Sequence, residues 1–102
     1  MDILKQLAEE FKIRNTQVEN TVKLIDEGNT IPFISRYRKE MTGGLDDQLL
    51  RELIERLTYL RNLESRKEEV KNLIENGGNL TDKITQDLLN AKTLAEVEDI
   101  YR

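Results

Sequence analysis

Hydrophobic residues recur along this chain at spacings of three and four, which is the pattern of helices that bury one face. No segment keeps the alternation of apolar and polar residues that marks a β-strand. The pattern therefore predicts an all-α fold. Residues that start and stop helices divide the chain into about six helices. The expected starts are Asp2, Thr16, Thr30 or Ile31, Asp46, Thr81 and Thr93.

The first two helices have clear boundaries in the sequence. Asp2 is expected to cap a helix that runs through Phe11. Thr16 is expected to open the second helix, because Glu19 stands three residues later, which is the spacing of a capping box. Gly28 is expected to end it, since glycine readily adopts the left-handed conformation that follows many helices.

The third helix falls in the stretch TIPFISRYRKEMTGGL, residues 30–45, which contains the only proline of the chain. Pro32 is expected at the first helical position, where its missing N–H costs no hydrogen bond. Gly43 and Gly44 are expected to end the helix. On a helical wheel, the buried face of this helix consists of Phe33, Ile34, Tyr37 and Met41.

The longest predicted helix runs from Asp46 to about Glu75, because no glycine or proline interrupts this stretch. At a rise of about 1.5 Å per residue it would be about 45 Å long. Its apolar stripe turns by roughly 100° around the axis from Leu63 onward, which predicts a second packing face. We therefore expect one long central helix that bridges two helical subclusters.

Four leucines of this helix also keep the rhythm of a coiled coil. The next heptad would place Glu64 and Lys67 at the seam, which favours an intramolecular core over a dimeric coiled coil. We therefore expect the chain to be monomeric or weakly associating. The four leucines are Leu50, Leu53, Leu57 and Leu60.

Two shorter helices complete the expected fold. Thr81 is expected to cap the fifth helix, and Thr93, with Glu96 three residues later, is expected to open the sixth. Tyr101 and Arg102 continue the pattern of the sixth helix without a stop signal. Residues 1–102 are therefore expected to form a single helical domain, the N-terminal fragment of a longer multidomain protein.

Composition narrows the possible chemistry. The formal net charge is −4, which gives no general attraction to nucleic acid or to anionic membranes. No apolar run approaches the ~18 residues that span a bilayer, and the first residues do not resemble a secretory signal, so a cytoplasmic protein is expected. The chain has no cysteine and no histidine, and its acids lie scattered beside Lys and Arg. We expect no enzymatic activity, no cofactor and no metal site.

Positive charge concentrates in one segment of this acidic chain. Arg36, Arg38 and Lys39 are the candidate nucleic-acid-binding residues. A helix-turn-helix formed by the second and third helices is the alternative reading, because the connection between them is short. A recognition helix must project polar side chains into the major groove. Only Ser35, Arg36 and Lys39 face outward on the third helix, and acidic neighbours surround them. A packing and turn element is therefore favoured.

The same basic residues also have acidic neighbours. Arg36 stands four residues before Glu40, within reach of an ion pair. Arg38 lies near the apolar edge of the third helix, where its stem can cover apolar surface. We expect its guanidinium to pair with Asp46 or Asp47 just beyond the glycine turn.

Three phrases of the sequence resemble one protein family. The run IPFISRYRKEMTGGLD, residues 31–46, closely resembles the signature near the start of the bacterial Tex proteins, which are transcription accessory factors. The segment LESRK, residues 63–67, followed by Val70, and the segment AKTLAEVEDIY, residues 91–101, are similar to later family phrases in the same order. The structural residues of the signature are Pro32, Phe33, Tyr37, Gly43 and Gly44.

The resemblance implies a function that composition does not show. Tex proteins carry a helical N-terminal region, a nuclease-like domain thought inactive, helix-hairpin-helix elements and a C-terminal OB-type RNA-binding domain. It implies that this chain is a helical scaffold and interaction module, with the rest of the parent protein and transcription-machinery proteins as partners. RNA binding would then belong to the absent C-terminal domain. The alternative is a weak nucleic-acid-contacting module that uses residues 36–39.

Overall fold

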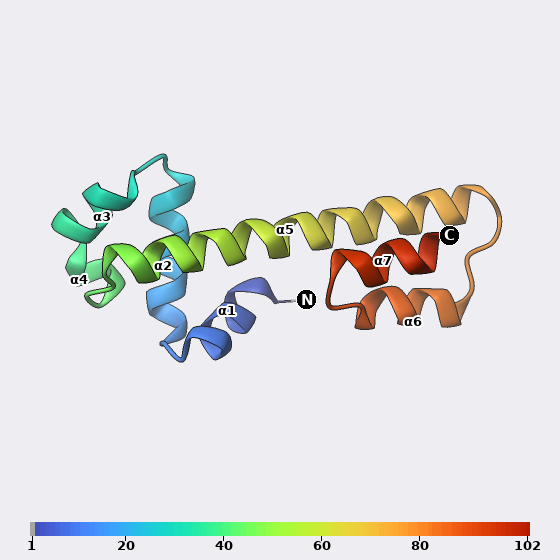
Figure 1. The fold of residues 1–102 in the computed structure, drawn as a ribbon, viewed down its shortest axis with the longest axis horizontal. Helices are drawn as coiled ribbons and strands as arrows, with labels where there is room; N and C mark the ends of the chain where they lie inside the picture. The colour runs from blue at the N-terminus through green and yellow to red at the C-terminus, as the bar shows by residue number, and fades with distance from the viewer. Residues whose placement is uncertain (1) are drawn as a thin grey trace. The chain divides into compact units, whose positions relative to one another are not determined.

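The computed structural model describes residues 2–102, which contain seven α-helices and no β-strand (Figure 1). The predicted all-α fold is confirmed. One helix more than expected is present because the predicted third helix is two helices. The elements are α1 (Ile3–Phe11), α2 (Asn15–Asp26), α3 (Ile31–Tyr37), α4 (Lys39–Thr42), α5 (Asp47–Asn76), α6 (Asp82–Asn90) and α7 (Leu94–Tyr101).

The chain forms two compact units, here called the N-terminal unit (residues 2–58) and the C-terminal unit (residues 59–102). Helix α5 is continuous and contributes to both, as the change in its apolar stripe predicts. Asp46 caps it, because its Oδ1 accepts a hydrogen bond from the backbone N–H of Leu49 at 2.8 Å. The predicted long helix is confirmed, with a start one residue later than expected.

Three further caps follow the sequence prediction. The side chain of Asp2 accepts from the N–H of Lys5 at 3.1 Å, and Thr81 accepts from Ile84 at 3.2 Å. Thr93 accepts from the N–H of Glu96 at 3.1 Å. The carboxylate of Glu96 reaches one residue beyond the expected capping box, to the N–H of Lys92 at 2.7 Å.

The predicted start of the second helix is wrong. Helix α2 begins at Asn15, so Thr16 and Glu19 lie inside it. The residue that reaches back is Gln17, whose side-chain oxygen accepts from the N–H of Arg14 at 3.0 Å. Gly28, with φ of 93°, follows the end of α2 as expected.

The core of the N-terminal unit comes from each of its longer helices. Helix α1 packs on α2, and α2 packs on α4. The leucines of the coiled-coil rhythm are at most 2% exposed, which confirms the predicted intramolecular core; Leu60 belongs to the C-terminal unit. The buried apolar residues of the N-terminal unit are Leu7, Ala8, Val18, Val22, Leu24, Ile34, Leu45, Leu50, Leu53 and Leu57.

The C-terminal unit buries a smaller apolar set. Helices α6 and α7 pack on each other and lie beside the later turns of α5 (Figure 1). The buried apolar residues are Leu60, Leu63, Val70, Leu88, Ala91 and Val97. Because this unit buries few apolar groups, its polar contacts contribute a larger share of its stability than those of the N-terminal unit.

Candidate interaction surface

The predicted third helix breaks at Arg38, where φ is −131° and ψ is 30°. Residues on the two sides of the break therefore do not share one helical wheel. Ile34 is fully buried, but Tyr37 is 60% exposed, so the predicted burial of Tyr37 is wrong. Phe33 and Met41 are half-buried. The break leaves an aromatic and basic segment at the surface, here called the α3–α4 surface (residues 33–39).

Helix α3 starts with a side-chain cap. Thr30 Oγ1 accepts a hydrogen bond from the N–H of Phe33 at 3.3 Å, so Thr30 is the cap and Ile31 the first helical residue. Pro32 therefore occupies the second helical position, one later than predicted, where its missing N–H is equally harmless. Ile34, two residues further, anchors this short helix in the core.

Phe33, Tyr37 and Arg38 form a compact group on this surface. The two rings lie 5.3 Å apart between centroids and are tilted by 48°. The guanidinium carbon of Arg38 lies 4.9 Å from the centroid of Phe33, and its Nη1 donates to the carbonyl of Tyr37 at 2.9 Å. Arg38 does cover apolar surface, but its predicted pairing with Asp46 or Asp47 is wrong, because it binds the adjacent backbone.

Arg36 and Lys39 face a different part of the unit. Together with Ser35 they line a shallow depression whose other wall, at the start of α5, includes Asp46 and Asp47. Among residues 2–102, no hydrogen bond or ion pair holds the side chain of Arg36 or Lys39. The Arg36–Glu40 ion pair, which their spacing would allow, does not form. The three candidate cations are therefore divided between two environments. Their role in nucleic-acid binding stays a prediction.

The glycine turn after α4 is held by α2. Gly43 and Gly44 have φ of 74° and 86°, in the region that favours glycine, as their predicted role requires. Gln17 Nε2 donates to the carbonyl of Thr42 at 2.9 Å, and Asn20 Nδ2 donates to that of Met41 at 2.9 Å. These bonds satisfy carbonyls at the end of α4.

Gly43 has a second reason to be glycine. A Cβ at this position would lie 2.4 Å from Nε2 of Gln17, so a side chain would displace the amide that binds Thr42. The sequence analysis missed Gln17 and Asn20. Their signal was the placement of uncharged amides beside the buried Val18 and Thr21 of α2, where a chain this rich in charge could have carried charged residues.

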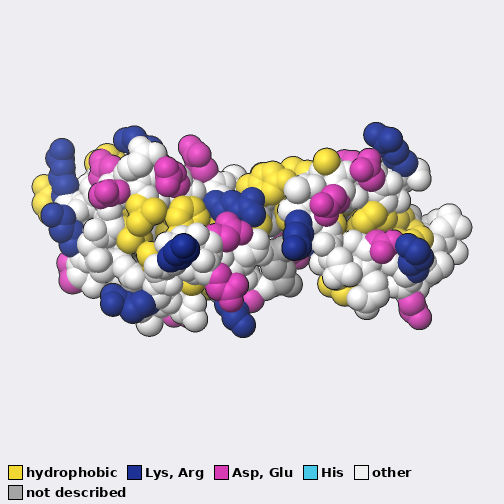
Figure 2. All heavy atoms as spheres, turned by 60° about the horizontal axis from the view of Figure 1, so that its bottom comes forward, with side chains coloured by type: hydrophobic (Ala, Val, Ile, Leu, Met, Phe, Trp, Pro, Cys, Tyr) yellow, Lys and Arg dark blue, Asp and Glu magenta, His cyan; other side chains and the backbone are white. Residues whose placement is uncertain are grey.

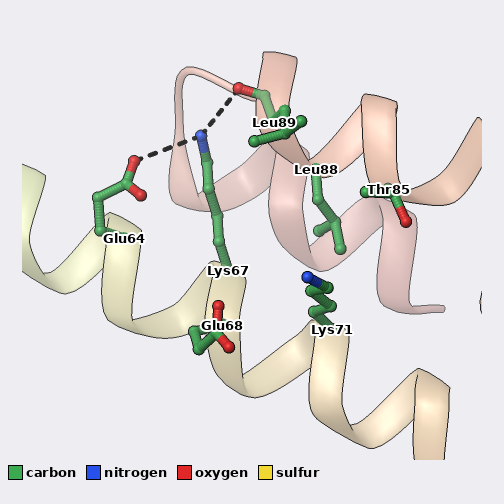
Figure 3. Close-up of a pocket in the computed structure, with 7 residues that line it drawn as sticks. All are labelled: Glu64, Lys67, Glu68, Lys71, Thr85, Leu88 and Leu89. Carbon is green, nitrogen blue, oxygen red and sulfur yellow. Dashed lines mark hydrogen bonds and ion pairs between the residues drawn. The ribbon is translucent and has the colours of Figure 1, made fainter. Parts of the chain in front are cut away.

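The C-terminal unit uses its basic residues internally. Lys67 is 7% exposed, and its Nζ donates to the carbonyl of Leu89 at 3.3 Å and lies 3.7 Å from Glu64 Oε1. Figure 3 shows the Lys67 side chain rising from α5 between these two groups. The Leu89 carbonyl belongs to the last turn of α6 and so has no hydrogen-bond partner within that helix. The Lys67 ammonium supplies this partner.

The pocket around Lys67 is small. Glu68, Lys71, Thr85 and Leu88 complete its lining together with the three residues just described (Figure 3). Acidic and basic side chains alternate along the α5 wall, while α6 supplies Thr85 and two leucines. Glu64 and Lys67, which interrupt the coiled-coil rhythm, thus lie where α5 contacts α6.

Arg66 joins α5 to α7. Its Nε and Nη2 donate to the two carboxylate oxygens of Glu98 at 2.6 and 3.0 Å, and it also pairs with Glu69. The hydrogen bond from Arg66 lowers the pKa of Glu98, and the bonds to Glu98 and Glu69 raise the pKa of Arg66. The guanidinium carbon also lies 5.5 Å from the ring centroid of Tyr101.

Each unit also has a polar contact that joins α5 to another helix. In the C-terminal unit, the hydroxyl of Tyr59 accepts from the N–H of Leu94 at 3.0 Å and so satisfies the start of α7. In the N-terminal unit, Arg56 donates to both carboxylate oxygens of Glu10 at 2.8 and 3.1 Å, joining α5 to α1. The hydrogen bond from Arg56 lowers the pKa of Glu10.

The described residues contain no cluster suited to metal binding. Within residues 2–102, no group of three or more Asp or Glu side chains is arranged to hold an ion. None of the helices in this range combines the length and apolar character needed to cross a membrane. The geometry therefore defines an all-helical module in which Tyr37, on the α3–α4 surface, is the most exposed aromatic residue of the described chain.

Comparison with known proteins places this module in a family. The family profile described as Tex-like protein N-terminal domain matches residues 1–75. The chain therefore belongs to the Tex-like N-terminal domain family, as its signature in residues 31–46 indicated.

Bacterial and animal relatives can be aligned with almost the whole chain. The Transcriptional accessory protein Tex of Neisseria gonorrhoeae is 46% identical over 101 residues, covering 99% of this chain and 13% of that protein. Protein YhgF of Escherichia coli is 48% identical over 95 residues, covering 93% and 12%. The human S1 RNA-binding domain-containing protein 1 is 33% identical over 99 residues, covering 97% and 10%. The chain thus corresponds to a small part of each relative.

Proposed function

We propose that this chain is the N-terminal helical scaffold and interaction module of a Tex-like transcription accessory protein in the cytoplasm. It carries no catalysis and offers the α3–α4 surface to the rest of the parent protein or to proteins of the transcription machinery. The observation that carries the proposal is the exposure of Tyr37 within the family signature, where Arg36 and Lys39 also lie without a hydrogen-bond or ion-pair partner among the described residues. Large aromatic and arginine side chains are enriched where proteins bind each other.

RNA binding in this proposal belongs to a C-terminal OB-type domain of the parent protein. The name of the human relative includes an S1 RNA-binding domain, and this chain covers 10% of that protein. The net charge of −4 also supports the assignment, because nucleic-acid affinity comes largely from neutralising several phosphates.

A second candidate function is weak nucleic-acid contact through a helix-turn-helix-like arrangement of α2 and α3. Residues 30–45 carry three basic side chains against one acidic side chain, a local net charge of +2. The arrangement weakens this alternative, because Arg38 covers Phe33 while Arg36 and Lys39 share a depression with Asp46 and Asp47. A strand of phosphates crossing that depression would meet two carboxylates.

Titration with fluorescently labelled single-stranded RNA and duplex DNA at two salt concentrations separates the two functions. The scaffold function predicts dissociation constants no lower than about 10⁻⁴ M at physiological salt, the weak end of non-specific binding. Micromolar binding that weakens steeply with salt, and that disappears in the double variant Arg36→Glu/Lys39→Glu, would favour the nucleic-acid function. The variant Lys23→Glu/Lys92→Glu, which reverses two exposed charges elsewhere, is the matched control.

A further inference from the structure

We propose that Phe33, Tyr37 and Arg38, here called the platform, bind a short peptide segment in which a large apolar side chain stands next to carboxylates. The inference rests on the proposed function and names the chemistry of the partner. The platform combines an exposed ring, a half-buried ring and a cation within six consecutive residues. Figure 2 shows basic and hydrophobic side chains side by side at the end of the N-terminal unit that contains α3 and α4.

The aromatic part of the platform is unusually open. Tyr37 is 60% exposed although it stands in a helix anchored by the fully buried Ile34. Its ring is braced by Phe33 at 5.3 Å, so a partner side chain would meet a surface that is already ordered. Tyrosine contributes large contact area at a low cost in conformational entropy, because it has few rotatable bonds. The ring is therefore suited to receive an apolar side chain.

The cationic part of the platform is fixed before any partner arrives. Arg38 lies 4.9 Å from the Phe33 centroid and uses Nη1 to bind the Tyr37 carbonyl at 2.9 Å. A guanidinium has five N–H donors, so Nε and Nη2 retain donors for a carboxylate. Because the side chain is already held, ordering it on binding costs less free energy than ordering a mobile lysine.

The charge distribution favours a peptide over a nucleic acid. The platform contains one cation, whereas the other two basic residues of the segment, Arg36 and Lys39, line the depression that Asp46 and Asp47 share. A nucleic-acid strand gains affinity from a succession of cations along its phosphates. A peptide that places one carboxylate on Arg38 and one apolar side chain on Tyr37 would match the groups of the platform.

The test is a titration of the whole 102-residue chain, labelled with ¹⁵N, with four probes. They are the blocked peptides acetyl-EEFEE-amide, acetyl-EESEE-amide and acetyl-KKFKK-amide, and an octamer of uridine. Backbone amide shifts at residues 33–39 should saturate with acetyl-EEFEE-amide, with the other three binding at least about fivefold more weakly, or about 1 kcal/mol. Equal binding of acetyl-EESEE-amide, or tighter binding of the uridine octamer at these residues, would overturn the proposal.

Three variants assign the effect to the platform. Tyr37→Ala and Arg38→Gln should each weaken acetyl-EEFEE-amide binding at least about fivefold. Lys39→Gln removes a neighbouring charge outside the platform and should change the affinity less than about twofold. An equal loss in Lys39→Gln would show diffuse charge attraction and would reject the platform. Unchanged amide dispersion and thermal midpoint show that each variant is folded, which the exposure of Tyr37 leads us to expect.

A separate measurement keeps this proposal distinct from the proposed function. A photo-reactive benzoylphenylalanine in place of Tyr37 in the longer parent protein should form protein cross-links in cells that resist ribonuclease. Such cross-links together with absent binding of acetyl-EEFEE-amide would reject the peptide chemistry alone. Cross-links that ribonuclease destroys would reject both the peptide and the scaffold function.

Discussion

Two basic segments of this chain behave in opposite ways. In the C-terminal unit, Arg66 binds Glu98 and Lys67 closes the end of α6, so both cations serve internal packing. In the N-terminal unit, Arg36 and Lys39 have no partner among the described residues, and the nearby Tyr37 is exposed. The contrast shows that local density of positive charge does not indicate function by itself. What matters is whether carboxylates and helix ends lie within reach.

The comparison also explains how each unit is stabilised. The N-terminal unit buries a larger set of apolar side chains and holds its glycine turn with the amides of Gln17 and Asn20. We therefore expect the cations of residues 36–39 to contribute little to its stability. The C-terminal unit buries fewer apolar groups and relies on Arg66, Lys67 and Tyr59 to position α6 and α7. Basic residues are free to take part in recognition where other contacts already stabilise the fold.

The largest effect on stability is expected at Ile34, the buried residue of α3. Ile34→Ala should lower the free energy of unfolding by about 2–5 kcal/mol, because it empties a fully buried site. Tyr37→Ala, on the same helix, should lower it by less than about 1 kcal/mol. Urea denaturation of the two variants provides the comparison. Similar losses would mean that Tyr37 belongs to the core and would reject the α3–α4 surface as an interaction surface.

The glycine turn should be the next most sensitive feature. Gly43→Ala should cost about 1–2 kcal/mol for the left-handed backbone, and about 1–3 kcal/mol more for the displaced Gln17 bond to Thr42. Gly44→Ala should cost only the first amount, because a Cβ there meets no atom within 4 Å.

A double-mutant cycle tests the cause of that difference. Gln17→Ala should cost stability in the wild type and much less in the Gly43→Ala background, because the same hydrogen bond is lost in both. Strictly additive costs in urea denaturation would show that Gln17 does not hold the turn.

Lys67 distinguishes the structural cations from the exposed ones. Lys67→Ala should destabilise by about 1–3 kcal/mol, because the Leu89 carbonyl and the buried Glu64 oxygen lose their cation. Lys67→Met keeps most of the stem and should show how much of the loss is polar. Lys39→Ala should stay within about 0.5 kcal/mol. Equal effects of Lys67→Ala and Lys39→Ala in urea denaturation would erase the contrast between the two segments.

The smallest expected effect is a pH dependence from Glu98. Its pKa is lowered in the folded state from an ordinary value of 4.5 by the hydrogen bond from Arg66. Its contribution to stability is therefore present above the unfolded pKa and is lost as pH falls through the lower folded pKa. Glu98→Gln should reduce the difference between unfolding free energies measured at pH 7 and pH 3. An unchanged difference would show that the pair does not couple to folding.

Much of the fold was predictable because neighbouring residues determine where each helix begins and ends. Asp2, Thr81 and Thr93 cap helices as expected, and the uninterrupted stretch after Asp46 forms the long helix. These features depend on residues within one turn of each other. The seam leucines were also predicted correctly, since their period alone indicates one buried stripe.

The break at Arg38 could not be predicted from local patterns. Helix α4 is held by Gln17 and Asn20, which lie more than twenty residues earlier, and this contact competes with continuation of α3. A helical wheel gives the face on which a residue lies but not whether another element covers that face, so it placed Tyr37 inside. The partners Glu98 of Arg66 and Leu89 of Lys67 likewise lie more than twenty residues away in the sequence. The sequence therefore indicated where charge gathers but not which cations remain unpaired.

The central claim is that residues 36–39 are surplus to folding while residues 66–67 are required for it. Urea unfolding of two charge-removal variants in one buffer at pH 7 tests it most directly. Arg36→Gln/Arg38→Gln/Lys39→Gln should stay within about 1 kcal/mol of the wild type, since a solvent-exposed cation–π contact is worth no more. Arg66→Gln/Lys67→Gln should lose clearly more stability. The reverse order would contradict the account, because the α3–α4 cations would then be structural.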